Sequence, residues 1–107
     1  MTSVQGSLIR QLAKKRQIVF SEHALERMFE RGIEITNILE SIQSGEEIEV
    51  QDFGPHEDIR VLFQEATNDI PGFYVVVAAC FPRALVLTVC LTEQEIWQYK
   101  NGKLVRR

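Results

Sequence analysis

The sequence predicts an α+β domain in which N-terminal helices pack on a roughly four-stranded antiparallel sheet. Two observations predict this class: apolar residues recur at helical spacing as far as Gly45, and they alternate with a period of two from Ile48 onward. Length is a third observation, because 107 residues suit one domain with one core. We therefore expect residues 1–107 to fold as a single domain.

Three helices are expected before Gly45. The first covers residues 3–16, and the second begins at Ser21, a favoured N-cap residue, and ends at Gly32, a favoured C-terminal stop. The third runs from about residue 34 to 44. Their predicted apolar faces are Leu8, Ile9, Leu12 and Ala13 in the first helix, Ala24, Leu25, Met28 and Phe29 in the second, and Ile35, Ile38, Leu39 and Ile42 in the third.

Strand-like patterns follow the helices. Residues 73–81 and 85–92 are apolar on both faces, so we expect two central strands joined by a tight hairpin at Pro82-Arg83-Ala84. Shorter strand-like runs occupy residues 18–20, 47–51 and 59–64.

The C-terminal end allows two interpretations. Thr92 and Glu95 have capping-box spacing, which predicts a short C-terminal helix through Trp97 and Tyr99. The alternative is a hairpin that turns on Asn101-Gly102.

Composition and charge narrow the class of protein. No apolar run approaches the ~20 residues of a membrane span, and the N-terminus lacks a signal-peptide pattern, so we expect a soluble, cytoplasmic protein. Cys80 and Cys90 lack metal-ligand spacing, and we expect neither a metal nor another cofactor. The net charge of −3 is uneven: residues 1–33 and 71–107 carry +3 each, whereas residues 34–70 carry −9. Basic ends on an acidic protein leave room for a local anion site.

A polar ridge on the second helix carries the clearest chemical signal. His23, Arg27 and Arg31 are spaced i, i+4, so they form one row beside the apolar stripe. Histidine moves protons near neutral pH, and arginine offers planar donors to phosphoryl oxygens that gain charge. RNA supplies its own nucleophile, the 2′-hydroxyl. The ridge therefore suits phosphodiester cleavage without a metal, although a solvated face with weak pairs such as Arg27 with Glu30 is the alternative.

Other candidates lie outside the ridge. Arg60 and Arg83 are candidate substrate-binding residues if the fold brings them to the same site. His56 lies in an acidic turn, where a plain surface role is expected. The aromatic candidates, which either stack on bases or belong to the core, are Tyr74, Trp97 and Tyr99.

The segment from Phe20 to Ile33 also carries a resemblance. Its hydroxyl residue followed by His-Ala, then Arg-Met, then Arg-Gly-Ile resembles the signature of a bacterial family of domains of unknown function, number 4258. The order of elements is similar from about Ile18 to Leu91. The resemblance implies a fold similar to the RelE-like and barnase-like ribonuclease toxins, and family members have been proposed as metal-independent ribonucleases.

Carried over by position, the resemblance implies that His23, Arg27 and Arg31 are the family's polar site residues. Cys90 departs from the family pattern, which usually shows tyrosine there. The leading hypothesis is thus a toxin-type endoribonuclease acting on single-stranded RNA, with a cognate antitoxin as partner. It predicts that the three ridge residues converge on one concave, solvent-reachable spot.

Two rival hypotheses remain. A non-catalytic interaction module would use the same ridge and the acidic segment 45–58, with the ridge residues splayed or paired with Glu26 and Glu30. A homodimer formed through the N-terminal helix is the other.

Overall fold

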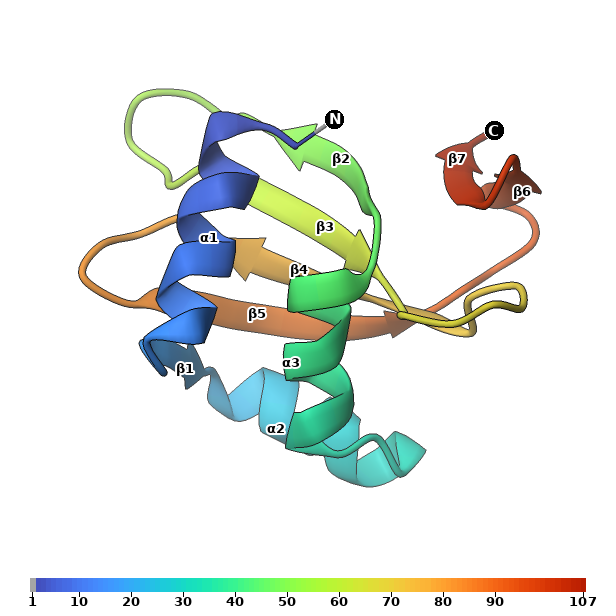
Figure 1. Cartoon of the computed structure of the whole chain (residues 1–107), viewed down its shortest axis with the longest axis horizontal. Coiled ribbons are helices and arrows are strands. Elements are labelled where there is room, and N and C mark those ends of the chain that lie inside the picture. Colours follow the sequence, from blue (N-terminus) through green and yellow to red (C-terminus); the bar gives the residue numbers. More distant parts are fainter. Residues whose placement is uncertain (1) are drawn as a thin grey trace.

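The computed structural model describes residues 2–107, which form three helices and seven strands (Figure 1). Among these residues, no helix is long and apolar enough to cross a membrane. The elements are α1 (Val4–Lys14), β1 (Ile18–Phe20), α2 (Glu22–Arg31), α3 (Ile35–Ser44), β2 (Glu47–Gln51), β3 (Arg60–Gln64), β4 (Phe73–Ala78), β5 (Ala84–Leu91), β6 (Trp97–Lys100) and β7 (Lys103–Arg106).

Strands β1 to β5 form one mixed sheet in the order β1-β5-β4-β3-β2. Strand β1 pairs parallel with β5, and the other neighbours are antiparallel. The predicted α+β class and the two central strands, β4 and β5, are confirmed. The expected four-stranded antiparallel sheet is wrong in one respect, because residues 18–20 join residues 84–86 as a fifth, parallel edge strand.

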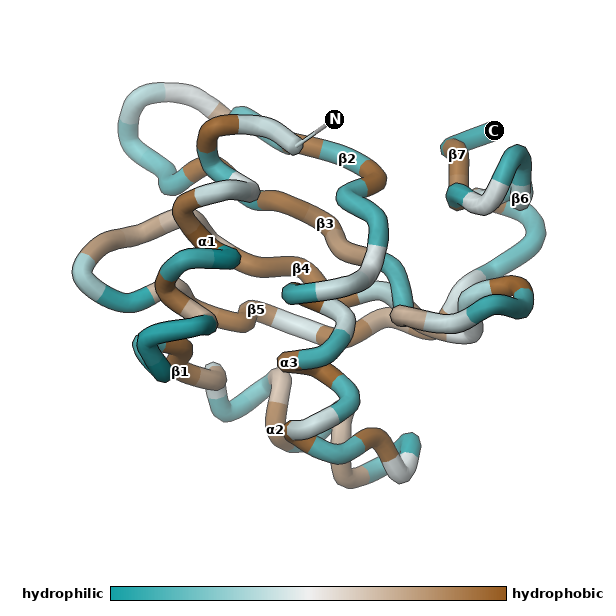
Figure 2. Tube along the Cα trace, viewed as in Figure 1, coloured by the Kyte–Doolittle hydropathy of each residue, from teal (hydrophilic) through white to brown (hydrophobic). Residues whose placement is uncertain are grey.

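The main core lies between the helices and one face of the sheet. Helices α1 and α3 lie side by side across this face, and α2 packs on β5 (Figure 1). Strands β3, β4 and β5 are hydrophobic along most of their length, whereas the 52–58 loop is hydrophilic (Figure 2). The side chains of this core with no exposed surface include Ile9, Ile38, Ile42, Val61, Phe63, Val75, Val77, Val86 and Val89.

The predicted helix faces are only partly buried. On α1, Ile9, Leu12 and Ala13 are buried, so the sheet covers most of the stripe that suggested a homodimer. The homodimer itself stays a prediction. On α3, Ile38 and Ile42 are buried as expected, whereas Leu39 is half-buried and Ile35 is exposed.

The C-terminal strands β6 and β7 form a hairpin that covers part of the second sheet face. Trp97 and Leu104 are buried there against Leu62 and Val76. The buried Gln64 side chain fixes the hairpin, because its Nε2 donates to the Gly102 carbonyl at 2.9 Å and its Oε1 accepts from the Leu104 N–H at 2.8 Å.

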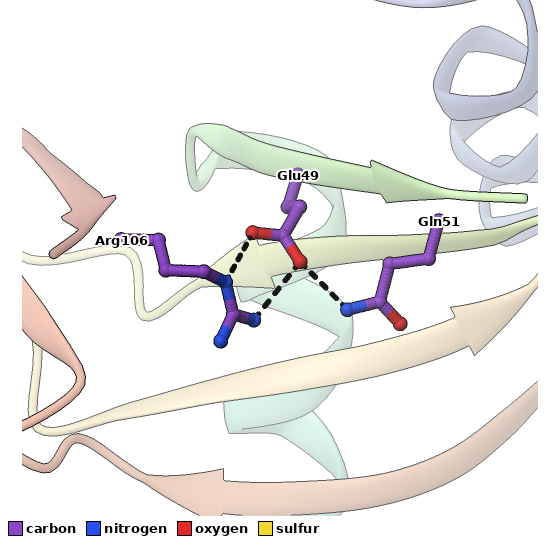
Figure 3. Close-up of polar contacts among 3 residues, drawn as sticks. All are labelled: Glu49, Gln51 and Arg106. Atoms are coloured by element: carbon purple, nitrogen blue, oxygen red, sulfur yellow. Dashed lines mark hydrogen bonds and ion pairs between the residues drawn. The ribbon is translucent and has the colours of Figure 1, made fainter.

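A polar contact at the edge of the sheet also holds this hairpin (Figure 3). The Arg106 guanidinium donates to both carboxylate oxygens of Glu49, at 2.8 and 2.9 Å, and the Gln51 amide adds a third bond at 2.7 Å. The hydrogen bond from Arg106 is the main reason that the pKa of Glu49 lies below its ordinary value, while partial burial opposes the shift.

The hairpin corrects the prediction of a short C-terminal helix. Asn101 and Gly102 both have positive φ angles, 53° and 81°, and they join β6 to β7 as a two-residue turn. A two-residue turn with positive φ at both positions matches the right-handed twist of paired strands, and Asn-Gly is its preferred sequence. The alternative interpretation of this end is therefore the one that holds.

The connection between the central strands also differs from the prediction. Strand β4 ends at Ala78 rather than Phe81, whose side chain is 77% exposed. Residues 79–83 form the connection, so the expected tight hairpin at Pro82-Arg83-Ala84 is wrong. Ala84 is already the first residue of β5, because its N–H donates to the Gln17 carbonyl beside β1 at 3.0 Å.

Candidate active site

Helix α2 is fixed to β5 by its N-cap residue, Ser21. The Ser21 hydroxyl oxygen accepts from the Ala24 N–H at 3.0 Å, which is the predicted N-cap contact. The same hydroxyl donates to the Leu87 carbonyl of β5 at 2.8 Å. At the other end, Gly32 adopts the left-handed conformation (φ 65°) that favours glycine. One serine therefore both starts the helix and anchors it to the strand.

The buried face of α2 is narrower than the sequence predicts. Ala24 and Met28 are buried, but Leu25 is exposed and the Phe29 side chain is 90% exposed. Only one side of the helix meets β5. Arg27 and Arg31 are half-buried, whereas His23 is exposed, and the ridge of these three residues lies along the end of β5.

An open cleft of about 570 Å³ lies between this ridge and the end of β5. His23, Arg27 and Arg31 all line it, so the structure brings the three ridge residues together. The opposite wall comes from β4, β5 and the segment leading into β6: Tyr74, Thr88, Val89, Cys90, Leu91, Thr92, Glu93, Ile96 and Trp97.

The two arginines differ in how they are held. An Arg31 Nη donates to the carbonyl oxygen of Val89 in β5, so its guanidinium is fixed at the cleft wall. Arg27 pairs with Glu30 at 2.9 Å, but the two side chains remain 38% and 53% exposed. An exposed i, i+3 pair of this kind contributes roughly 0–1 kcal/mol. An anion in the cleft therefore competes with Glu30 for Arg27 at small cost.

The far wall of the cleft contains two buried polar groups with unmet hydrogen bonds. Within residues 2–107, neither the Trp97 Nε1–H nor the Thr92 hydroxyl has a hydrogen-bond partner. Leaving such a group unpaired costs free energy. Trp97 is only 2% exposed, so this aromatic candidate is a core residue and does not stack on a base.

Tyr74 and Cys90 face each other across β4 and β5. They are direct partners in the strand register, and the Tyr74 ring meets Trp97 edge-on with centroids 5.1 Å apart. Burial is the largest influence on the Tyr74 hydroxyl and raises its pKa, with Trp97 acting in the opposite direction. Tyr74 therefore stays protonated at neutral pH and can donate a hydrogen bond. A tyrosine thus lines the cleft although position 90 is cysteine.

Glu93 is the residue of this cleft that sequence reasoning missed. It is the only carboxylate among the residues that line the described cleft. The capping-box interpretation of Thr92 and Glu95 placed this segment in a helix, and so it gave no signal for a cleft wall. With Glu93 opposite the ridge, the cleft holds a carboxylate, an imidazole and two guanidiniums.

Arg60 and Arg83 do not join the cleft. Arg60 pairs with Ala78 at the end of β4 away from Tyr74, lines a separate hollow with His56, and stacks on the Phe53 ring at 4.9 Å. Arg83 precedes the first residue of β5, whereas the cleft lies along the last residues of that strand. Their assignment as substrate-binding residues is not supported by this geometry.

Fold and cleft together define a small α+β domain with an open cleft that is rich in basic side chains. The chain belongs to the family described as domain of unknown function DUF4258, whose model matches residues 20–90. The predicted resemblance is thereby confirmed. The matched range includes the whole ridge and Cys90, whereas α1, Glu93 and the C-terminal hairpin lie outside it. Comparison with curated proteins and with solved structures found no match.

Proposed function

We propose that this protein is a metal-independent endoribonuclease that cleaves single-stranded RNA. The observation that supports the proposal is the convergence of His23, Arg27 and Arg31 on one solvent-open cleft. We propose further that it acts in the cytoplasm as the toxin of a toxin–antitoxin pair, related to the RelE-like and barnase-like ribonucleases.

The proposed reaction uses the RNA 2′-hydroxyl as nucleophile. Attack of the 2′-oxygen on phosphorus forms a 2′,3′-cyclic phosphate and breaks the bond from phosphorus to the 5′-oxygen. Glu93 accepts the proton of the 2′-hydroxyl, and the imidazolium form of His23 donates a proton to the leaving 5′-oxygen. The two groups lie among the residues that line the cleft, and proton transfer of this kind contributes roughly 10²–10⁴-fold to a rate.

Arg27 and Arg31 hold the phosphate in this scheme. A guanidinium has five N–H donors, so Arg31 keeps free donors although one of its nitrogens binds Val89. Tyr74 also lines the cleft, and its hydroxyl, which is protonated at neutral pH, donates a further hydrogen bond to a phosphoryl oxygen. Donors fixed before the reaction stabilise the charge that develops in the transition state.

A non-catalytic interaction module is the second candidate. It is favoured by the internal partners of both arginines, since Arg27 pairs with Glu30 and Arg31 binds the Val89 carbonyl. In that case the ridge stabilises the fold or binds an acidic partner.

Cleavage of a mixed-sequence single-stranded RNA in excess chelator tests the proposal. We expect cleavage by the wild-type protein, no cleavage of the same sequence as DNA, and a rate at least 10²-fold lower in His23→Ala and Glu93→Gln. Matched controls are His56→Ala and Glu57→Gln, which replace the same residue types outside the cleft and keep the wild-type rate. A folded wild-type protein that leaves RNA intact, or equal rates in all variants, contradicts the ribonuclease.

A further inference from the structure

A second surface is separate from the active-site cleft and shares no lining residue with it. An apolar groove of about 410 Å³ runs between the end of α1, strand β1 and the start of α3. Its volume is within the range of about 300–1,000 Å³ typical of ligand sites. Five of its six lining residues are apolar, and Arg16 is the sixth; the apolar ones are Ala13, Ile18, Phe20, Ile35 and Leu39.

Strand β1 forms the floor of the groove and has a free edge. It is the last strand of the sheet, and its only partner among the described elements is β5. The Gln17 carbonyl and the Ser21 N–H both form hydrogen bonds to β5. Because the backbone groups of every second residue in a strand point to the same side, the N–H and carbonyl of Val19 also face β5. The N–H groups of Ile18 and Phe20 therefore point outward. Such an edge is a template for an additional strand.

The rim of the groove is basic. Residues 1–21 contain Arg10, Lys14, Lys15 and Arg16 and no acidic residue. Lys14, Lys15 and Arg16 are all exposed where α1 ends, directly before β1. Arg16 adopts a left-handed backbone (φ 59°), which is unfavourable for a residue other than glycine. Three consecutive cations thus stand at one end of an open strand edge.

We propose that β1 and this groove bind an extended, acidic segment of a partner protein, which adds to the sheet as a sixth strand. Its backbone pairs with Ile18 and Phe20, its alternate apolar side chains enter the groove, and its acidic residues meet Lys14, Lys15 and Arg16. The edge supplies main-chain pairing, the groove selects apolar side chains, and the basic rim selects the charge. The surface is independent of the active-site cleft, so the proposal does not rest on the ribonuclease activity.

A labelled peptide tests this surface directly. The probe is a fluorescein-labelled peptide of alternating valine and threonine flanked by glutamates at both ends, with a second peptide that carries lysines in place of the glutamates. We expect the acidic peptide to bind in fluorescence anisotropy and the basic one to bind at least tenfold more weakly. Amide hydrogen exchange of the complex should show new protection at Ile18 and Phe20.

Variants locate the binding on the protein. The double variant Lys14→Glu/Lys15→Glu keeps the apolar groove and should weaken binding of the acidic peptide at least tenfold. Leu39→Ser, which changes the groove, should weaken this binding by at least the same factor. The matched controls are Lys100→Glu/Lys103→Glu, a charge reversal in the hairpin, and Val4→Ser, which removes an exposed apolar side chain at the other end of α1. Both controls should bind like the wild type.

Several results would overturn the proposal. These are no binding of the acidic peptide, equal binding of both peptides, binding insensitive to both site variants, and binding without protection of Ile18 and Phe20. Sedimentation of the protein alone tests one further result that would overturn the proposal. If the protein is a dimer and Leu39→Ser dissociates it, the groove binds a second copy of the chain.

Discussion

At the scale of single residues, Gly45 shows how closely two parts of the backbone approach. Its φ of −75° suits any residue, so the backbone conformation alone does not demand glycine. A Cβ built at this position collides instead with the carbonyl oxygens of Gln64 and Ser41, which are backbone atoms. The end of α3 therefore passes directly over the end of β3, with no space for a side chain.

We predict that Gly45→Ala destabilises the protein by about 1–3 kcal/mol, because the backbone must shift to admit the methyl group. Chemical denaturation measures the change. The control is Gly72→Ala, where the nearest atom to the new Cβ is a Glu65 carboxylate oxygen at 3.5 Å, an ordinary contact. Equal stability of both variants would mean that α3 and β3 are farther apart than the structure shows.

Residue spacing predicted the ridge but not its surroundings. His23, Arg27 and Arg31 are neighbours on any helix, so their common row follows from local geometry. Arg60 and Arg83 were candidates for the same site only through the fold, and strand direction placed both at the opposite end of the sheet. Glu93 was missed for the same reason, since its nearness to the ridge depends on contacts distant in sequence.

At the scale of elements, the ion pair between Arg106 and Glu49 adds to the contacts that hold the C-terminal hairpin. Arg106 holds the pKa of Glu49 below its ordinary value of 4.5. A depressed carboxyl pKa means that the stabilisation is complete above about pH 4.5 and is lost as the pH falls through the folded-state pKa. The hairpin should therefore be held less tightly in acid.

We predict that lowering the pH below 4.5 weakens the hairpin by about 1 kcal/mol or less, because the Arg106 side chain of the pair is 49% exposed to solvent. Trp97, the single tryptophan, belongs to this hairpin, is buried against the sheet, and reports loosening of the hairpin by fluorescence. Glu49→Gln should remove the acid-dependent change, whereas Glu57→Gln in the 52–58 loop should retain it. An unchanged acid transition in Glu49→Gln would mean that other groups control the hairpin.

Elements with a local signal were predictable and those with a non-local cause were not. The N-cap at Ser21 and the stop at Gly32 lie within the helix that they bound, and both are confirmed. Strand β1 has three residues, and only its distant partner β5 decides its place in the sheet. The prediction of a C-terminal helix was wrong because the capping-box spacing of Thr92 and Glu95 is a weaker signal than the Asn-Gly turn at residues 101 and 102.

At the scale of the whole molecule, the charge distribution limits the number of phosphate contacts that the proposed RNA substrate could make. The protein carries a net charge of −3, and the cleft contributes Arg27 and Arg31 as its permanent cations. Each phosphate neutralised on a single strand adds about −0.7 to the slope of log affinity against log salt. A ribonuclease that contacts phosphate only in this cleft should therefore bind with weak salt dependence.

We predict a slope of about −1.4 for binding of single-stranded RNA to the inactive His23→Ala variant, which corresponds to two phosphate contacts. Adding Arg27→Ala to this variant should make the slope less negative by about 0.7. Titrations at several salt concentrations measure both values, and Arg83→Ala in the same background should leave the slope unchanged. A much steeper slope would show that basic surfaces outside the cleft hold the RNA.

Strand β5 also decides when during synthesis the cleft can first exist. The ridge is synthesised before the strand that α2 packs against, and before the segment with Glu93 and Trp97. Until β5 leaves the ribosome, β1 has no strand partner, α2 lacks the strand on which it packs, and His23, Arg27 and Arg31 face no opposite wall. A nascent chain therefore cannot assemble this cleft until the residues of β5 and Glu93 have left the ribosome.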